Sequence, residues 1–154
     1  MKPWIAMIMV GALGGCGSRS TFSFVMKDGD AVQNVSSSAD VSGSVNNAGL
    51  VTLEDSAWAL EMNLQGLSAG NHALSKNAGE LQIRHKDTSD TFKTSLGGTC
   101  NVWLHPHGSA NGSVVSGDLD CTGLTSLMGK QVDITSGSFE VEINDPANNP
   151  TKKR

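Results

Sequence analysis

Trp58-Ala59-Leu60-Glu61-Met62-Asn63-Leu64 has the clearest alternation of apolar and polar residues in the chain. Its large apolar side chains fall on every second residue, and small or polar side chains fall between them. A β-strand points successive side chains to opposite faces, so this spacing predicts a strand with one buried face and one wet face. An amphipathic helix would repeat its apolar positions every three to four residues. The chain is therefore expected to contain a sheet that covers a core with one face.

Similar alternation predicts further strands on both sides of this segment. These segments cover residues 22–26, 41–45, 50–53, 73–74 and 81–83. We expect a hairpin at Asn46-Asn47-Ala48-Gly49, because asparagine and glycine tolerate the dihedral angles of tight turns. The residues between Met26 and Ala39 are mostly polar, and we expect an exposed loop there with a turn at Asp28-Gly29-Asp30.

Two irregular features are expected towards the C-terminus. Residues 122–128 are the best candidate for a short helical turn, and Gly129 is placed to end it. The apolar residues 132 and 134 occupy even positions, whereas the apolar residues 139, 141 and 143 occupy odd positions. In one regular strand the two groups would point to opposite faces of the sheet. Ser136-Gly137-Ser138 must therefore shift the strand register by one residue, which predicts a β-bulge or a tight bend.

Composition restricts the class of protein. The 154 residues include fifteen acidic and eleven basic side chains, eighteen glycines and no tyrosine. This composition and the alternation are typical of an antiparallel β protein with many turns, and the length fits one domain. We expect a single all-β domain over residues 21–143, an antiparallel β-sandwich or flattened barrel, followed by a disordered tail over residues 144–154. The acidic balance argues against nucleic acid as a partner.

The first sixteen residues have the features of an export signal. Lys2 precedes an apolar run over residues 4–13, and Leu13-Gly14-Gly15-Cys16 follows. The run is too short to cross a bilayer as a permanent helix, and it ends in small residues of the kind that signal peptidases accept. With a cysteine directly after these small residues, the segment resembles the lipobox of bacterial lipoproteins.

The resemblance implies a membrane anchor at Cys16. In that family the cysteine receives acyl chains and becomes the first residue of the mature protein, so residues 1–15 would be a cleaved signal-peptide helix and residues 16–20 a lipidated tether. Several acyl chains hold a protein on a membrane, whereas one chain is marginal. Gly17 stands where an aspartate would retain the protein in the inner membrane, so the resemblance favours the outer membrane. The alternatives are an ordinary cleaved secretory signal and an uncleaved amphiphilic helix.

The remaining cysteines, Cys100 and Cys121, select one alignment of two strands. If the chain folds back around a loop centred between residues 110 and 111, the two cysteines lie opposite each other on antiparallel strands. The same register pairs Val102 with Leu119 and Leu104 with Gly117. The apolar pattern and the cysteine spacing thus agree on one register. We expect a disulfide because an exported protein meets oxidising conditions; two buried free thiols are the alternative.

The opposite face of this hairpin carries the candidate binding residues. Trp103, His105 and His107 are expected there, facing Asp118 and Asp120. A large aromatic side chain on a wet face often marks a contact surface, unless another strand covers it. His105-Pro106-His107 and a nearby carboxylate have the chemistry of zinc or copper ligands, but no third ligand has a diagnostic spacing, and a solvated loop is the other interpretation.

The sequence contains no recognisable catalytic or cofactor motif. It has no Gly-x-Ser-x-Gly elbow, no His-Glu-x-x-His pair and no phosphate-binding glycine loop. We therefore expect a lipid-anchored envelope protein with a non-catalytic binding or structural role, requiring no cofactor and no metal, whose partner is an envelope protein, a glycan or a small apolar ligand. The alternative is an envelope metal-binding protein or hydrolase that uses the face of His105, His107 and Asp118.

Overall fold

The computed structural model describes residues 20–37 and 41–145 of the chain. Regular structure in these residues consists of antiparallel β-strands. The strands are β1 (Thr21–Asp28), β2 (Ala31–Ser36), β3 (Ser42–Val45), β4 (Leu50–Glu54), β5 (Trp58–Asn63), β6 (Gly70–Leu74), β7 (Glu80–His85), β8 (Thr91–Lys93), β9 (Thr99–Leu104), β10 (Val114–Ser126) and β11 (Gln131–Glu142). None of the described residues belongs to a helix long and apolar enough to cross a membrane.

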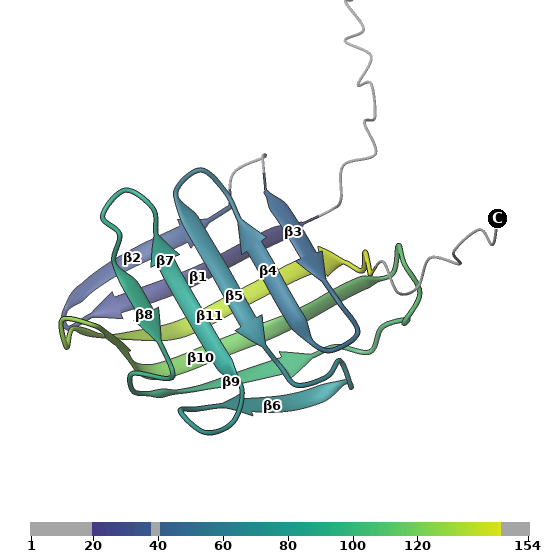
Figure 1. Cartoon of the computed structure of the whole chain (residues 1–154). Coiled ribbons are helices and arrows are strands. Elements are labelled where there is room, and N and C mark those ends of the chain that lie inside the picture. Colours follow the sequence, from purple (N-terminus) through teal and green to yellow (C-terminus); the bar gives the residue numbers. More distant parts are fainter. Residues whose placement is uncertain (1–19, 38–40, 146–154) are drawn as a thin grey trace, which may run out of the picture.

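The sheet curls so that two layers face each other (Figure 1). One layer contains β3, β4, β5, β7 and β8, and the other contains β1, β2, β11, β10, β9 and β6. The long strand β10 belongs to the second layer but reaches the first, because Thr125 and Ser126 at its C-terminal end pair with β8. The expectation of an all-β antiparallel sandwich or flattened barrel is confirmed.

The core lies between the layers and is built from the alternating apolar positions. Trp58, Leu60 and Met62 of β5 are buried, and so is Leu64 directly after this strand. Their strand β5 lies between β4 and β7, where cross-strand neighbours complete the buried face. The second layer contributes side chains such as Phe139, which is also buried.

The cysteine pairing and the register shift were both predicted correctly. Cys100 and Cys121 form a disulfide, and β9 and β10 pair in the expected register. On β11, the pairing to β1 jumps from Ser136 to Ile134, which leaves Thr135 as an extra residue. This bulge lets buried side chains continue on the opposite phase after the shift.

The prediction of a loop between Met26 and Ala39 is wrong for Ala31–Ser36, which form the mostly exposed strand β2, whereas the expected turn at Asp28-Gly29-Asp30 is confirmed. Residues 38 and 39 lie outside the described part of the chain. The strand β1 continues to Asp28, the chain turns at Gly29 with a φ of 58°, and β2 pairs back along β1. The strand β2 lies at the sheet edge, and among its residues only Val35 is buried. An edge strand with one buried residue carries no alternation that the sequence could reveal.

The prediction of a helical turn over residues 122–128 is also wrong. The strand β10 continues to Ser126, but its buried positions change phase between Cys121 and Leu124. Gly123, with a φ of 68°, lies at this irregularity. The resulting three-residue spacing imitates helical periodicity, although a second bulge causes it. Gly129 follows in the tight turn that leads to β11.

The two ends of the sandwich differ. The described chain enters β1 and leaves β11 at the same end, because Thr21 pairs with Glu140 (Figure 1). The β1–β2 and β10–β11 turns lie at the opposite end, where Lys27 pairs with Asp133. Ser20, which we assigned to the tether, and Asp145, which we assigned to the tail, are both buried. The expected signal peptide, Cys16 and residues 146–154 of the tail lie outside the described residues.

Candidate functional site

The predicted binding face lies on the outer side of β6, β9, β10 and β11. Asn71, Trp103, Asp118 and Ser138 pair in that order across the four strands, so their side chains leave the same face. A shallow hollow lies beside this row. Its lining is Asn71, Asn101, Trp103, Asp118, Leu119, Asp120 and the bulge residues Thr135, Ser136 and Gly137. We call this surface the Trp103 face.

Trp103 is 55% exposed, so neither β6 nor another described strand covers its indole. Asn71 and Asp118 lie directly opposite it on the two neighbouring strands. Asn101 and Asp120 form the next pair along the sheet, and the Asn101 amide donates to the Asp120 carboxylate at 3.4 Å. The exposed aromatic ring is therefore surrounded by amide and carboxylate groups.

His105 belongs to the edge of this face. Its Nε2 lies 2.8 Å from an Asp118 carboxylate oxygen, and its Nδ1 lies 3.2 Å from the Ser116 hydroxyl. Both side chains of the His105–Asp118 pair are well exposed, at 44% and 63%. A solvent-exposed pair of this kind contributes at most about 1 kcal/mol to stability. Its main effect is to orient the Asp118 carboxylate beside Trp103.

His107 points to a different part of the molecule. Its Nε2 lies 2.7 Å from the carbonyl oxygen of Leu67, and its Nδ1 lies 2.7 Å from the carbonyl oxygen of Gly108. Both ring nitrogens are thus occupied by loop backbone, and His107 does not converge with His105 and Asp118. Within residues 20–37 and 41–145, no group of three or more His, Cys, Asp or Glu side chains is arranged to hold a metal ion. The geometry gives no support to the metal-binding alternative.

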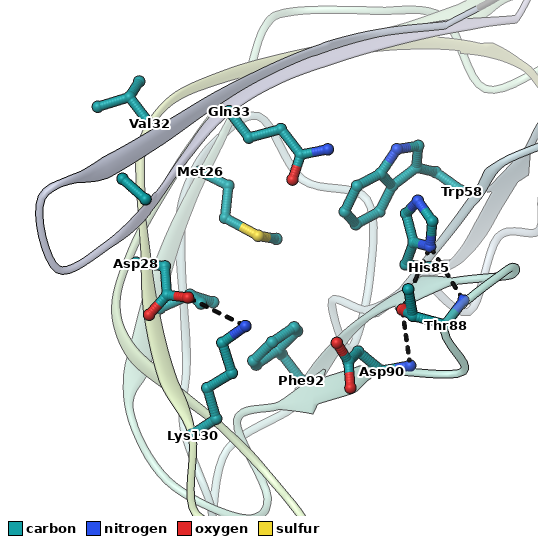
Figure 2. A pocket seen from close by; sticks show the side chains of 12 residues that line it. Met26, Asp28, Val32, Gln33, Trp58, His85, Thr88, Asp90, Phe92 and Lys130 are labelled. Atoms are coloured by element: carbon teal, nitrogen blue, oxygen red, sulfur yellow. Dashed lines mark hydrogen bonds and ion pairs between the residues drawn. The ribbon is translucent and has the colours of Figure 1, made fainter.

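A second candidate site, which sequence reasoning missed, opens at the end of the sandwich that carries the β1–β2 and β10–β11 turns (Figure 2). We call this cavity the mouth. Its floor is apolar and consists of Met26, Trp58, Phe92 and Val132, all of them buried core residues. Its rim is mostly polar, with Asp28, Gln33, His85, Thr88, Asp90 and Lys130, and it also includes the apolar Ala31 and the exposed Val32. These residues come from both layers.

Local turns position the residues of the mouth. The buried carboxylate of Asp55 accepts hydrogen bonds from the backbone N–H groups of Ala57 and Trp58, at 2.9 and 2.8 Å, and so fixes the start of β5. The Trp58 ring then packs edge-on against the rings of Phe24 and His85, with centroids 5.3 and 4.6 Å apart. These contacts fix the position of the indole in the floor of the mouth.

The rim of the mouth carries charges of both signs. Lys130 Nζ lies 3.0 Å from an Asp28 carboxylate oxygen and 5.9 Å from the centroid of the Phe92 ring. The hydrogen bond to Asp28, followed by the negative charges of Asp28 and Asp90, raises the pKa of Lys130 above its ordinary value, and partial burial opposes this. Elsewhere on the rim, His85 Nδ1 accepts a hydrogen bond from the Thr88 backbone N–H at 3.2 Å. A neutral His85 ring therefore carries its proton on Nε2.

The two sites differ in how visible they are in the sequence. The Trp103 face follows from the phase of one hairpin whose register the cysteines fix. The mouth is formed where separate hairpins end, and no spacing along the chain connects Met26, Trp58 and Phe92. A large aromatic at the first residue of a strand, as Trp58 is, was the one local signal of a side chain at the end of the sandwich.

The fold and these two surfaces define an all-β domain with an exposed aromatic face and a small amphipathic cavity. Compared with family models, curated proteins and solved structures, the chain matches none of them. Evidence for its function therefore comes from the chemistry of its own residues.

Proposed function

We propose that this protein is a non-catalytic binding module, anchored by lipid in the bacterial cell envelope, and that its Trp103 face binds a glycan. The observation that carries the proposal is the indole of Trp103, 55% exposed and bordered by Asn71 and Asp118 on the two neighbouring strands. The anchor is supported by the lipobox-like Leu13-Gly14-Gly15-Cys16. Gly17 after the cysteine favours the outer membrane.

The chemistry of this face matches that of a sugar ring. A pyranose has an apolar face of C–H bonds, which stacks on an aromatic ring, and a rim of hydroxyl groups that both donate and accept hydrogen bonds. The indole supplies the flat apolar surface. The amides of Asn71 and Asn101 supply donors and acceptors, and the carboxylates of Asp118 and Asp120 supply acceptors. The shallow hollow leaves room for a chain of sugars to run across the strands.

Charge narrows the class of glycan. The hollow is lined by two carboxylates, and none of the residues that line it is lysine or arginine. An acidic polysaccharide would be repelled, whereas a neutral glycan or an amino sugar would not. The proposed ligand is therefore a neutral or amino-sugar glycan of the envelope or its surroundings.

Affinity electrophoresis tests the proposal. The full chain, purified from membranes in detergent, would migrate through native gels that contain neutral, amino-sugar or acidic polysaccharides. We expect retardation by a neutral or amino-sugar polymer, loss of at least tenfold in affinity for Trp103→Ala, and a smaller loss for Trp103→Phe, which retains an aromatic face. Met128→Ala is the matched control, because Met128 is 91% exposed on the β10–β11 turn, outside the Trp103 face.

Three results with the polymers and Trp103→Ala would contradict the proposal, and one result with the control variant would do so as well. The three are equal retardation of Trp103→Ala and the unmodified chain, stronger retardation by the acidic polymers, and no retardation by any polymer. Loss of retardation in Met128→Ala would indicate non-specific adhesion of apolar side chains and would also contradict it.

A further inference from the structure

We infer that the mouth is a second binding site, and that its ligand is a small water-soluble primary amine with an apolar body, recognised through the carboxylate of Asp90. This inference concerns a different surface from the Trp103 face. It does not depend on glycan binding, and either proposal can fail without the other.

The size and lining of the mouth suit a small amphipathic molecule. The cavity has a volume of about 280 Å³, close to the lower limit of about 300 Å³ for pockets that hold small ligands. Its floor of Met26, Trp58, Phe92 and Val132 presents apolar surface that a hydrocarbon or aromatic body would cover. In Figure 2 the side chains of Met26, Trp58 and Phe92 surround an open space, with the polar groups at its border.

The charge of the rim selects the head group of the ligand. Two carboxylates, Asp28 and Asp90, stand against one ammonium group, Lys130, so the rim has an excess of one negative charge when His85 is neutral. Lys130 already pairs with Asp28 at 3.0 Å. The Asp90 carboxylate, by contrast, forms no ion pair within the part of the chain that the structure describes. An incoming cation therefore finds a free partner, whereas an incoming anion would have to displace Asp28 from Lys130.

Lys130 itself shows that the mouth attracts positive charge. Its ammonium group lies 5.9 Å from the centroid of the Phe92 ring, in the range of a cation–π contact. Asp28 and Asp90 raise its pKa, which means that both carboxylates stabilise a cation at this position. A second ammonium group near Asp90 would be attracted by the same aromatic ring and the same two carboxylates. Repulsion from Lys130 limits the ligand to one positive charge.

The position of the mouth favours a ligand from the aqueous phase. Its lining residues Asp28 and Lys130 lie beside the β1–β2 and β10–β11 turns. These turns are at the end opposite to the end where the chain enters β1 and leaves β11 (Figure 1). An anchor at Cys16 would join the end where the chain enters β1 to the membrane, so the mouth would face away from the bilayer. This orientation rests on the proposed anchor, whereas the cavity and its charge do not.

A series of three probes with one shared body tests the inference. The probes are 2-phenylethylamine, 2-phenylethanol and 3-phenylpropionate, which share a phenylethyl group and differ in the charge of the head. Binding would be followed by the NMR signal of the Trp58 indole N–H in the full chain, assigned by its absence in Trp58→Phe. For the amine we expect a dissociation constant on the order of 1 to 10 mM, given its few non-hydrogen atoms. The alcohol should bind more weakly, and the carboxylate at least tenfold more weakly.

Asp90→Asn should weaken binding of the amine about fivefold and leave the alcohol unchanged, since the variant removes one partly solvated charge pair. Asp87→Asn is the matched control: it removes the same charge from the same exposed turn, but Asp87 does not line the mouth. Tighter binding of the carboxylate than of the amine would overturn the inference, as would equal effects of Asp90→Asn and Asp87→Asn. A Trp58 signal that none of the probes moves would overturn it as well. Trp103→Ala should leave amine binding intact, which separates this test from that of the glycan.

Discussion

Asn111 and Asp145 bind each other through two hydrogen bonds that run in opposite directions. The Asn111 amide donates to the backbone carbonyl of Asp145 at 3.1 Å, and the Asp145 backbone N–H donates to the Asn111 side-chain oxygen at 3.0 Å. The Asp145 carboxylate also accepts from the backbone N–H of Asn47 at 2.9 Å. Asp145, three positions after the end of β11, thus joins the β9–β10 loop to the β3–β4 turn.

Asn111→Ala should therefore destabilise the protein. The substitution removes both side-chain hydrogen bonds and leaves partly buried backbone groups of Asp145 without them, which costs about 1 to 3 kcal/mol of unfolding free energy. Urea denaturation of the full chain measures this difference. Asn144→Ala is the matched control, because Asn144 is exposed, and it should change stability by less than about 0.5 kcal/mol. Equal effects of the two variants would show that the reciprocal pair has no special role.

How much of the fold the sequence predicts depends on how many positions of a strand are buried. The strands β5, β9 and the first part of β10 alternate without interruption, and the register of β9 with β10 followed from period two together with Cys100 and Cys121. The strand β2 was missed because Val35 is its single buried residue. The end of β10 was misinterpreted because the irregularity at Gly123 changes the phase of burial.

The pattern of burial along a strand also explains which of the two sites the sequence could reveal. Trp103 was placed on the outer face because its neighbours along the strand, Val102 and Leu104, had to point inward. His107 was placed on that face as well, but it lies past the end of β9, where strand alternation no longer determines direction, and the loop carbonyl of Leu67 holds it instead. The mouth depends on how hairpin ends meet in three dimensions, which no local pattern encodes.

Loss of the Cys100–Cys121 disulfide should lower stability more than any single surface substitution. The bond joins residues 21 positions apart, and closing a loop of this length stabilises the folded state by about 3 kcal/mol in the chain-entropy model. The double variant Cys100→Ala/Cys121→Ala should therefore unfold at a lower urea concentration. Reduction of the unmodified chain should lower its midpoint of urea unfolding to a similar concentration. The reductant should leave the midpoint of the double variant unchanged. A double variant as stable as the oxidised chain would show that strand pairing alone fixes this hairpin.

The Lys130–Asp28 pair should make stability depend on pH in the alkaline range. Asp28 raises the pKa of Lys130 above its ordinary value of 10.5, so the folded state holds this proton more tightly than the unfolded state does. The stabilisation is therefore fully present below pH 10.5 and is lost as the pH rises through the folded-state pKa. Both side chains are nearly half exposed, at 46% and 47%, and solvent screening limits the effect to less than about 1 kcal/mol.

Lys130→Met isolates this contribution. The difference in unfolding free energy between the unmodified chain and Lys130→Met should be constant from pH 7 to about pH 10 and should shrink above that range. It should also shrink in 1 M salt, because screening weakens exposed ion pairs. A difference that grows with pH would mean that Lys130 is stabilised as the neutral amine, contrary to its contact with Asp28.

The proposed anchor predicts a specific mass for the mature chain. If Cys16 is lipidated, intact-mass analysis of the membrane fraction should give a chain that begins at residue 16 and carries the mass of its acyl chains. Cys16→Ser should abolish both the lipid and the cleavage that depends on it, because the serine hydroxyl does not replace the thiol as lipid acceptor. Gly17→Ser is the matched control, since it changes the neighbouring residue and retains the thiol. An unmodified chain in the soluble fraction would contradict the anchor and the envelope location, while the glycan and amine tests would stand on their own residues.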